Sequence, residues 1–277
     1  MPIRPWRFCK ALPIVCYLLC CSWLLMDNAT HRFSVALSFQ GDLGFFLRQQ
    51  NKAELVIRVL SHKSSVKDVI ESCGVPHPEV DLLICNGRPV DFSFQLNADA
   101  TLEVYPVAPE LFPASRLQER GVHTFVADCH LGKLARELRL LGVDVSYRHD
   151  ATDQQLLETM VKENRALLTR DRTLLMHRVV RNGYFPRSQD SIEQTVEVVR
   201  RFELAERLTP FVRCLRCNGL LTKVPKESVL EQLEPLTRLY YHDFQRCSQC
   251  GRPYWRGSHI DRLTNRVESI LQRISAP

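Results

Sequence analysis

The sequence predicts a multidomain protein in which an α+β domain and an α/β domain precede a small cysteine-bound ribbon. Three observations lead to this fold class. Short strands surround one helix in residues 31–109, and strands alternate with helices in residues 122–208. That alternation is typical of a parallel sheet. Two CxxC pairs then lie within residues 209–259, which predicts a metal-held ribbon.

The composition is that of an ordinary globular protein. The chain has 277 residues, which is enough for two or three domains. Hydrophobic residues make up 45% and charged residues 25%, so there is ample material for at least one sizeable core. The formal net charge of +6 permits a nucleic-acid partner but does not require one.

Residues 1–30 form an apolar N-terminal extension. Basic residues precede an apolar run of 16 residues, Ala11–Met26, as in a signal peptide or a short anchor. That run is short for a membrane span. Unpaired cysteines and a four-thiolate site elsewhere suit a reducing compartment. We therefore expect a cytoplasmic protein without a stable membrane partner, whose fold starts after this extension. Export or anchoring is the alternative if residues 1–26 are a signal.

Residues 31–109 predict a small β-rich domain. Strand patterns lie at 31–39, 55–60, 82–85 and 101–105, with a helix at 65–74. This order resembles the β-grasp, or ubiquitin-like, fold, and most closely its sulfur-carrier type. Such carriers act through a C-terminal Gly-Gly, but here the last strand runs into Pro106–Pro109. We interpret the domain as an interaction or packing module, which could bind a protein partner, and residues 110–121 as a linker.

Residues 122–208 open with the segment around which the rest of the chain is organised. An apolar strand, Phe125–Ala127, ends at Asp128. An amphipathic helical pattern begins at once, and Gly142 is placed to stop it. Strand patterns recur at 143–147 and 166–169, each followed by another helical pattern.

Carboxylates follow the ends of these strands at three positions: Asp128, Asp150 or Asp153, and Asp171. The C-terminal ends of parallel strands lie along one edge of a sheet, so these carboxylates could converge there. Gathered within a few ångströms they would repel one another by roughly 1–4 kcal/mol per pair, and a divalent cation removes that cost. All-oxygen ligands suit magnesium or manganese. Such an ion can activate water and stabilise the charge on a phosphodiester, which is the chemistry of a metal-dependent nuclease.

Each aspartate also has a purely structural interpretation. Asp128 and Asp171 could each cap the helix or turn that follows. Asp153 lies in the first turn of a helix that Thr152 and Gln155 cap in a capping box, where the helix dipole favours a carboxylate. Asp150 could be only a loop residue.

The cysteine pairs give the strongest signal in the sequence. Cys214 and Cys217 form one knuckle, and Cys247 and Cys250 form the second. Four thiolates predict a closed, tetrahedral zinc site with a structural role and no open position for catalysis. Redox chemistry is the alternative for a single CxxC, and two pairs disfavour it. Residues 260–277 predict an amphipathic C-terminal helix and tail that pack on a neighbouring element.

Basic residues near both motifs suit an RNA partner. Lys133, Arg136 and Arg170 are candidates for binding phosphates near the aspartates, or are surface charges without a special role. Around the cysteines, basic residues alternate with Tyr254 and Trp255, as on a platform for single-stranded RNA. The alternative is that these two aromatic residues form the core of the ribbon.

Three long segments and the paired knuckles together resemble one known family. The segments are FVADCHLGKLARELRLLGVDV, LLTRDRTLL and GYFPRSQDSIEQTVEVVRRF. They look like the RNase domain named from the C-terminus of the Mut-seven exonuclease, and the resemblance covers residues 31–262. It implies a PIN-like three-layer α/β nuclease domain with a parallel sheet, fused to a zinc ribbon and preceded by a ubiquitin-like domain.

The resemblance also implies a function. It places an acidic centre at Asp128 and Asp171, with Asp153 as the third member. PIN nucleases generally use four acidic residues, and the fourth stays open between Asp150 and Asp190. The implied activity is hydrolysis of RNA phosphodiesters, with structural zinc and catalytic magnesium or manganese. The alternative is a non-catalytic RNA-binding or scaffold protein that keeps the fold and the zinc but lacks a complete acidic centre.

Overall fold

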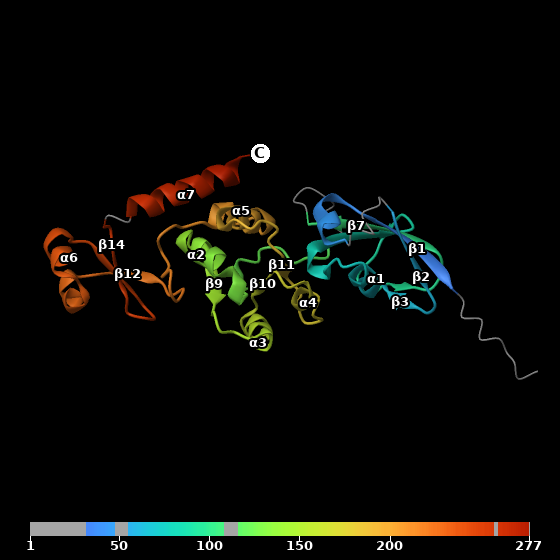
Figure 1. Cartoon of the computed structure of the whole chain (residues 1–277), viewed down its shortest axis with the longest axis horizontal. Helices are drawn as coiled ribbons and strands as arrows, with labels where there is room; N and C mark the ends of the chain where they lie inside the picture. The colour runs from blue at the N-terminus through green and yellow to red at the C-terminus, as the bar shows by residue number, and fades with distance from the viewer. Residues whose placement is uncertain (1–31, 48–54, 108–115, 258–259, 277) are drawn as a thin grey trace, which may run out of the picture.

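The computed structural model describes residues 32–47, 55–107, 116–257 and 260–276. Three folded units lie in a row, with the N-terminal sheet at one end, the parallel sheet in the middle and the ribbon at the other end (Figure 1). The apolar extension predicted at residues 1–30 lies outside the described residues, as does part of the predicted linker. Within the described ranges, no helix has the length and apolar character needed to cross a membrane.

The N-terminal unit is a five-stranded mixed sheet covered by one helix. Its strand order is β2-β1-β7-β4-β5, and only the central pair β1–β7 is parallel. The elements are β1 (Phe33–Phe39), β2 (Val56–Leu60), α1 (Val66–Ser72), β4 (Val80–Cys85), β5 (Arg88–Pro89) and β7 (Ala100–Pro106), with the short β3 (Ser64–Ser65) and β6 (Gln95–Leu96) pairing beside them. This is the β-grasp arrangement that the sequence predicts.

Local chemistry explains where these elements begin and turn. The Ser65 hydroxyl accepts a hydrogen bond from the Asp68 amide and so caps α1. Serine is one of the residues preferred at the N-cap of a helix. Asn86 and Gly87 both have positive φ angles, 48° and 76°, which is the tight hairpin turn that this dipeptide favours.

The middle unit is a four-stranded, fully parallel sheet in the order β11-β10-β8-β9. Its strands are β8 (Thr124–Ala127), β9 (Asp144–Tyr147), β10 (Ala166–Leu168) and β11 (Gly183–Tyr184), and its helices are α2 (Gly132–Leu140), α3 (Asp153–Glu163), α4 (Arg172–Leu175) and α5 (Ser191–Arg201). Alternate residues of β8 and β10 belong to two different hydrophobic clusters, one on each face of the sheet. Helices α2 and α5 cover one face, and α3 and α4 cover the other, which gives the three layers predicted.

The helix boundaries predicted in this unit are confirmed. Thr152 and Gln155 form a complete capping box at the start of α3. Gly142 follows α2 with a φ of 89°, a conformation that other residues rarely adopt. A Cβ atom there would also collide with the backbone carbonyl of Thr209, so the approach of the following unit requires glycine as well.

The C-terminal unit is a small antiparallel ribbon followed by a long helix. The ribbon consists of β12 (Leu221–Val224), β13 (Phe244–Cys247) and β14 (Pro253–Trp255), with α6 (Pro235–Tyr240) between its first two strands. The helix α7 (Ile260–Ser275) leaves the ribbon and packs along α5, where Val267 and Ile270 join the core of the middle unit. This confirms the predicted amphipathic C-terminal helix.

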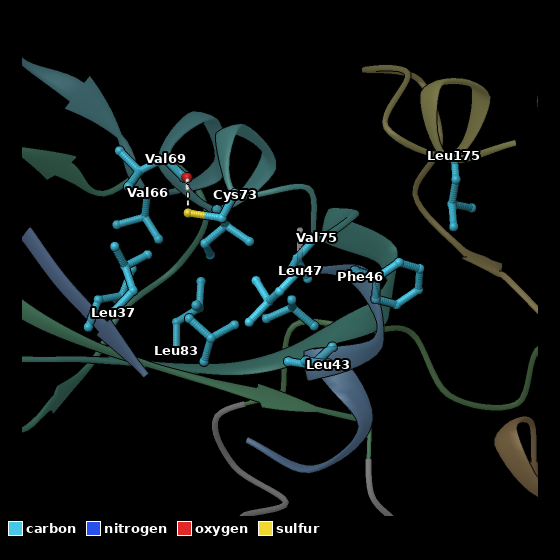
Figure 2. Packing of buried hydrophobic residues seen from close by; sticks show 14 of the residues in the cluster. Leu37, Leu43, Phe46, Leu47, Val66, Val69, Cys73, Val75, Leu83 and Leu175 are labelled. Carbon is cyan, nitrogen blue, oxygen red and sulfur yellow. Dashed lines mark hydrogen bonds between the residues drawn. The ribbon is translucent and has the colours of Figure 1, made fainter. Parts of the chain in front are cut away.

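The N-terminal domain packs against α4 and the β11 edge of the parallel sheet of its own chain. One continuous hydrophobic cluster runs from the β-grasp core through Phe46, in η1 (Gly41–Phe46), to Leu175 of α4. Figure 2 shows Phe46 on the side of this cluster nearest Leu175. The Phe46 carbonyl also accepts a hydrogen bond of 2.8 Å from Arg172, which precedes that leucine in α4. The interpretation as a packing module therefore holds within the chain itself.

A buried ion pair reinforces this contact. Glu79, in η3 (His77–Glu79), accepts hydrogen bonds from the Phe185 amide at 2.7 Å and from the Arg187 guanidinium at 2.8 Å. Glu79 is only 3% exposed. Burial raises the pKa of Glu79, and the charge of Arg187 opposes that rise. The two groups therefore stabilise each other, although Arg187 has a second acidic partner, the exposed Asp42, at 3.0 Å.

Replacing Glu79 with alanine is expected to lower the free energy of unfolding by about 2–4 kcal/mol, because it leaves the partly buried Arg187 with only the exposed Asp42 as an acidic partner and the Phe185 amide without its acceptor. Urea denaturation followed by far-ultraviolet circular dichroism measures the loss. The exposed Glu158 on α3 supplies a matched control, Glu158→Ala, for which a change within about 0.5 kcal/mol is expected. Equal stabilities of the two variants would contradict the structural role of the pair.

Candidate functional site

The candidate site lies where the two central strands of the parallel sheet end. Ala127 is the last residue of β8 and pairs with Leu168, the last residue of β10. The Asp128 amide then donates to the Leu168 carbonyl at 3.0 Å, so the ladder continues for one more residue. Asp128 and Thr169 consequently lie side by side at the C-terminal edge of the sheet, which is where open α/β sheets place ligands.

Asp128 is the best-fixed carboxylate of this edge. It is 6% exposed, and its Oδ2 accepts a hydrogen bond of 2.8 Å from the Thr169 hydroxyl. Its Oδ1 accepts from the His130 amide at 3.2 Å, which caps the short turn η5 (Cys129–Leu131). Burial raises the pKa of Asp128, but hydrogen bonds from Cys129, Thr169 and His130 outweigh it and hold that pKa below its usual value. Asp128 is therefore an ionised, oriented carboxylate.

Thr169 connects the second predicted aspartate to the first. The Asp171 amide donates to the Thr169 hydroxyl at 3.0 Å, while that hydroxyl donates to Asp128. The Asp171 Oδ1 caps α4 by accepting from the amides of Thr173 and Leu174. Thr169 is fully buried, and sequence reasoning assigned it no role. The signal available was a hydroxyl residue ending an otherwise apolar strand.

The other predicted aspartates have different surroundings. Asp153 is the first residue of α3 and is exposed. Asp150 is exposed and paired with Arg148 at 3.1 Å, and Asp190 is the N-cap of α5. In the part of the chain that the structure describes, neither Asp153 nor Asp171 belongs to a group of three or more ligand atoms within 4.8 Å of one another. The structure brings Asp128 and Asp171 to one edge through Thr169, and it does not gather the predicted trio into a closed ligand set.

Two residues that sequence reasoning did not single out stand beside Asp128. The Cys129 sulfur lies 3.4 Å from Nδ1 of His130, and that nitrogen lies 3.1 Å from Oδ1 of Asp128. These three side chains form one of the two clusters of at least three ligand atoms within the described residues. The hydrogen bond to Asp128 raises the pKa of the Cys129 thiol.

The predicted RNA-binding residues occupy two kinds of position. Lys133 and Arg136 are exposed on α2. Arg170 is half-buried, donates to the side-chain oxygen of Gln189 at 2.6 Å and lies over the Phe185 ring. Arg170 therefore also has a structural role in the loop before α5, while phosphate binding by all three stays a prediction.

The four cysteines converge as predicted. The sulfur atoms of Cys214, Cys217, Cys247 and Cys250 all lie within 4.8 Å of one another. Two of the sulfur–sulfur distances are 3.7 Å and 3.4 Å, close to the edges of a tetrahedral thiolate site. The amides of Gln249 and Cys250 point at the Cys247 sulfur, and a Cβ atom on Gly219 would lie 2.8 Å from that sulfur. The cluster could hold a structural metal ion with no position left open.

Thiol acidity supports metal binding at this cluster. Burial opposes ionisation of Cys214, but the Tyr254 hydroxyl and the amides of Cys217 and Arg216 lower the pKa of its thiol to about 6. Burial and the neighbouring sulfur atoms raise the pKa of Cys217. Four crowded thiols cannot all ionise unless a cation neutralises them, which is the role of zinc in such sites.

The first cysteine knuckle is fastened to the parallel sheet by buried polar groups. Arg139, 3% exposed on α2, donates to the carbonyls of Val145 at 2.7 Å and Arg216 at 3.0 Å. Asp144, at the start of β9, accepts from Asn218 at 2.8 Å and pairs with Arg213 at 3.2 Å. The ribbon is therefore docked next to β9. Sequence reasoning did not single out Arg139, because a charged residue in a helical pattern gives no sign that it is buried.

Comparison with known proteins agrees with this arrangement. The family model of the Mut7-C RNAse domain matches residues 123–267, just over half of the chain. The chain belongs to the Mut7-C RNAse domain family. A second family model, that of the Mut7-C ubiquitin domain, matches residues 33–111. Neither a search of curated proteins nor a search of solved structures found a match.

The family match confirms the predicted membership and its N-terminal ubiquitin-like domain. The Mut7-C RNAse match includes Asp128, Asp153 and Asp171 as well as all four cysteines of the knuckles. The sheet edge that carries Asp128 and Asp171, called the acidic edge below, therefore lies in the same family domain as the four-cysteine cluster.

Loss of one cysteine thiolate is expected to unfold the ribbon while the N-terminal sheet and the parallel sheet remain folded. The ribbon's own buried hydrophobic cluster among the described residues is only Val229, Leu233 and Phe244, so a metal bound by the four cysteines would supply most of its folding free energy. Amide hydrogen exchange of a Cys247→Ser variant should show β12–β14 losing protection, with β1 and β7 unchanged. A Cys73→Ala variant in the N-terminal core is the cysteine control. Unchanged protection of β12–β14 in Cys247→Ser would contradict a structural metal.

Asp144 gives a pH-dependent test of how the Mut7-C ribbon is docked. Burial raises the pKa of Asp144, but Arg165, Asn218 and Arg213 together lower it by more than burial raises it, so the net shift of the pKa is downward. A carboxyl group with a lowered folded-state pKa stabilises the fold above its unfolded-state pKa of about 3.9 and loses that contribution as pH falls through the folded-state pKa.

Asp144→Asn is expected to cost about 2 kcal/mol of unfolding free energy at pH 7. The difference in unfolding free energy between this variant and the unmodified chain should narrow below about pH 4. In the unmodified chain the Asp144 carboxyl is then increasingly protonated, first in the unfolded state and then in the folded state. Chemical denaturation at a series of pH values measures the gap, with the exposed Asp150→Asn as control. A gap that stays constant down to about pH 2 would contradict the assignment.

Proposed function

We propose that this Mut7-C protein is a metal-dependent ribonuclease that hydrolyses RNA phosphodiesters at the edge formed by β8 and β10. The family match supports ribonuclease activity in general. The single observation that carries the metal-dependent proposal is the linked geometry of Asp128, Thr169 and Asp171. Two ionisable carboxyl groups from different strands are held at one sheet edge, and a divalent cation would offset their repulsion.

The side chains of this edge would divide the work as follows. Asp128 Oδ1, which accepts from the His130 amide and not from Thr169, would bind the ion, while Thr169 keeps the carboxylate in place. Asp171 uses Oδ1 to cap α4, so its Oδ2 is the oxygen that would face the ion. Asp150, on the loop after β9, and Asp153, the first residue of α3, would supply the remaining acidic groups.

Magnesium or manganese bound there would activate water and stabilise the charge of the phosphodiester. Lys133, Arg136 and Arg170 would bind neighbouring phosphates and hold the RNA in position. The ribbon would carry structural zinc on its four cysteines and guide single-stranded RNA with its basic residues and Trp255, which is 37% exposed. The ubiquitin-like domain could bind a protein partner, and we expect the protein in the cytoplasm.

One observation favours the alternative of a non-catalytic RNA-binding or scaffold protein. Asp153 and Asp150 are exposed at the end of β9, and no group of three of the predicted carboxylates lies within 4.8 Å among the described residues. A chain with an incomplete acidic centre would bind RNA through the same basic residues without cutting it.

Asp128→Asn in the full chain is expected to lower the rate of RNA cleavage at least about 100-fold, because the ion contributes several kcal/mol of transition-state stabilisation. Fluorescently labelled single-stranded RNA is incubated with manganese or magnesium, and fragments are resolved by gel electrophoresis. Asp261→Asn, at the start of α7, is the charge-matched control and should cleave as the unmodified chain does.

Equal cleavage by the Asp128→Asn variant and the unmodified chain would place the activity outside this site. Stable RNA binding by both chains with no cleavage in either metal would support the scaffold alternative.

A further inference from the structure

The cluster beside the acidic edge contains more than oxygen ligands. Asp128, Cys129 and His130 are consecutive in the chain, and one ligand atom from each lies within 4.8 Å of the other two. The sulfur–nitrogen distance is 3.4 Å and the nitrogen–oxygen distance is 3.1 Å. A tetrahedral ion with bonds of about 2.0–2.3 Å holds neighbouring ligand atoms about 3.3–3.8 Å apart. The two contacts of His130 are therefore within a few tenths of an ångström of that spacing, and the third pair, sulfur and carboxylate oxygen, lies within 4.8 Å.

The turn that carries these ligands is held from several sides. The Tyr147 hydroxyl donates to the Cys129 carbonyl at 3.0 Å, and the Thr169 hydroxyl holds the Asp128 oxygen that is not in contact with His130. Gly132 allows this approach, because a Cβ atom there would lie 2.6 Å from the Tyr147 oxygen. Partners that fix a ligand from behind are the usual support of a metal site.

The cluster is open on its outer side. Asp128 is buried, Cys129 is partly exposed, and the His130 side chain is 79% exposed. Three protein ligands with solvent access is the arrangement of catalytic zinc sites, in contrast to the closed four-cysteine cluster of the ribbon. The fourth position would be available to water or to a phosphate oxygen.

The ligand types select a class of metal. Magnesium prefers oxygen ligands, whereas thiolate and imidazole suit zinc and its neighbours cobalt, nickel and copper. We propose that Asp128, Cys129 and His130 form an open, three-ligand site for a zinc-like divalent ion at the edge of the parallel sheet. The inference rests on the proposed function for its location, and it changes the ion expected at Asp128 from an oxygen-preferring one to a zinc-like one.

Counting bound metal tests the site without using activity. The full chain is loaded with zinc and dialysed, and zinc per chain is measured by inductively coupled plasma mass spectrometry. The double variant Cys129→Ala/His130→Ala is expected to bind one zinc fewer than the unmodified chain. A matched control, Cys73→Ala/His62→Ala, removes one cysteine and one histidine from the N-terminal domain and should lose none. Subtracting the zinc content of one double variant from that of the other cancels the zinc that both chains hold at other sites.

Cobalt substitution gives an independent readout. Cobalt at a site with one thiolate adds thiolate charge-transfer absorption to that of the four-cysteine cluster, and the increment should vanish in the Cys129→Ala/His130→Ala chain only. Affinity for the second ion should fall at least about 10–100-fold in either single variant. Equal zinc content and equal cobalt spectra in both double variants would overturn the proposal and leave the three side chains as a hydrogen-bonded turn.

The outcomes separate this inference from the ribonuclease proposal. A chain that binds the additional zinc but cleaves no RNA in any metal keeps the site and loses the activity. A chain that cleaves RNA with magnesium, depends on Asp128 and binds no additional zinc keeps the activity and loses the three-ligand site.

Discussion

Strands β8 and β10 end at the same level of the parallel sheet, and the proposed chemistry of this protein depends on that register. Ala127 and Leu168 pair as the last residues of β8 and β10, so the residues that follow them must leave the sheet side by side. Thr169 then connects Asp128 to the backbone of Asp171 through a single buried hydroxyl. A shift of the register by one residue would turn these side chains to opposite faces, so the pairing of the strands and the acidic edge stand or fall together.

Everything outside the parallel sheet stabilises it from a different side. The β-grasp domain packs against α4 and the β11 edge through a shared apolar core and the ion pair of Glu79 and Arg187. The ribbon is docked beside β9 by Arg139 and Asp144, and α7 returns from the ribbon to pack on α5. The N-terminal domain and the ribbon lie on either side of the parallel sheet (Figure 1).

Sequence patterns predicted the parts of this structure that depend on local chemistry. The capping box at Thr152, the stop at Gly142 and the knuckle spacing each reflect contacts between residues near in sequence, and each is confirmed. The burial of Glu79 and Arg139 could not be predicted, because each of them contacts a partner more than 70 residues away in the chain. The site shows the same division. Asp128 was visible at a strand end, and the sequence places Cys129 and His130 directly after it without giving the geometry of their side chains. The role of Thr169 depends on a contact across the fold.

The proposed chemistry requires a divalent ion bound to Asp128 at the edge of the sheet. Crystals of the full chain grown with manganese, with diffraction data collected at the manganese absorption edge, would locate this ion. We expect an anomalous peak about 2.0–2.3 Å from a carboxylate oxygen of Asp128, on the side of the edge shared with Asp171. Manganese peaks confined to other parts of the molecule, with Asp128 bound only to its protein partners, would contradict it.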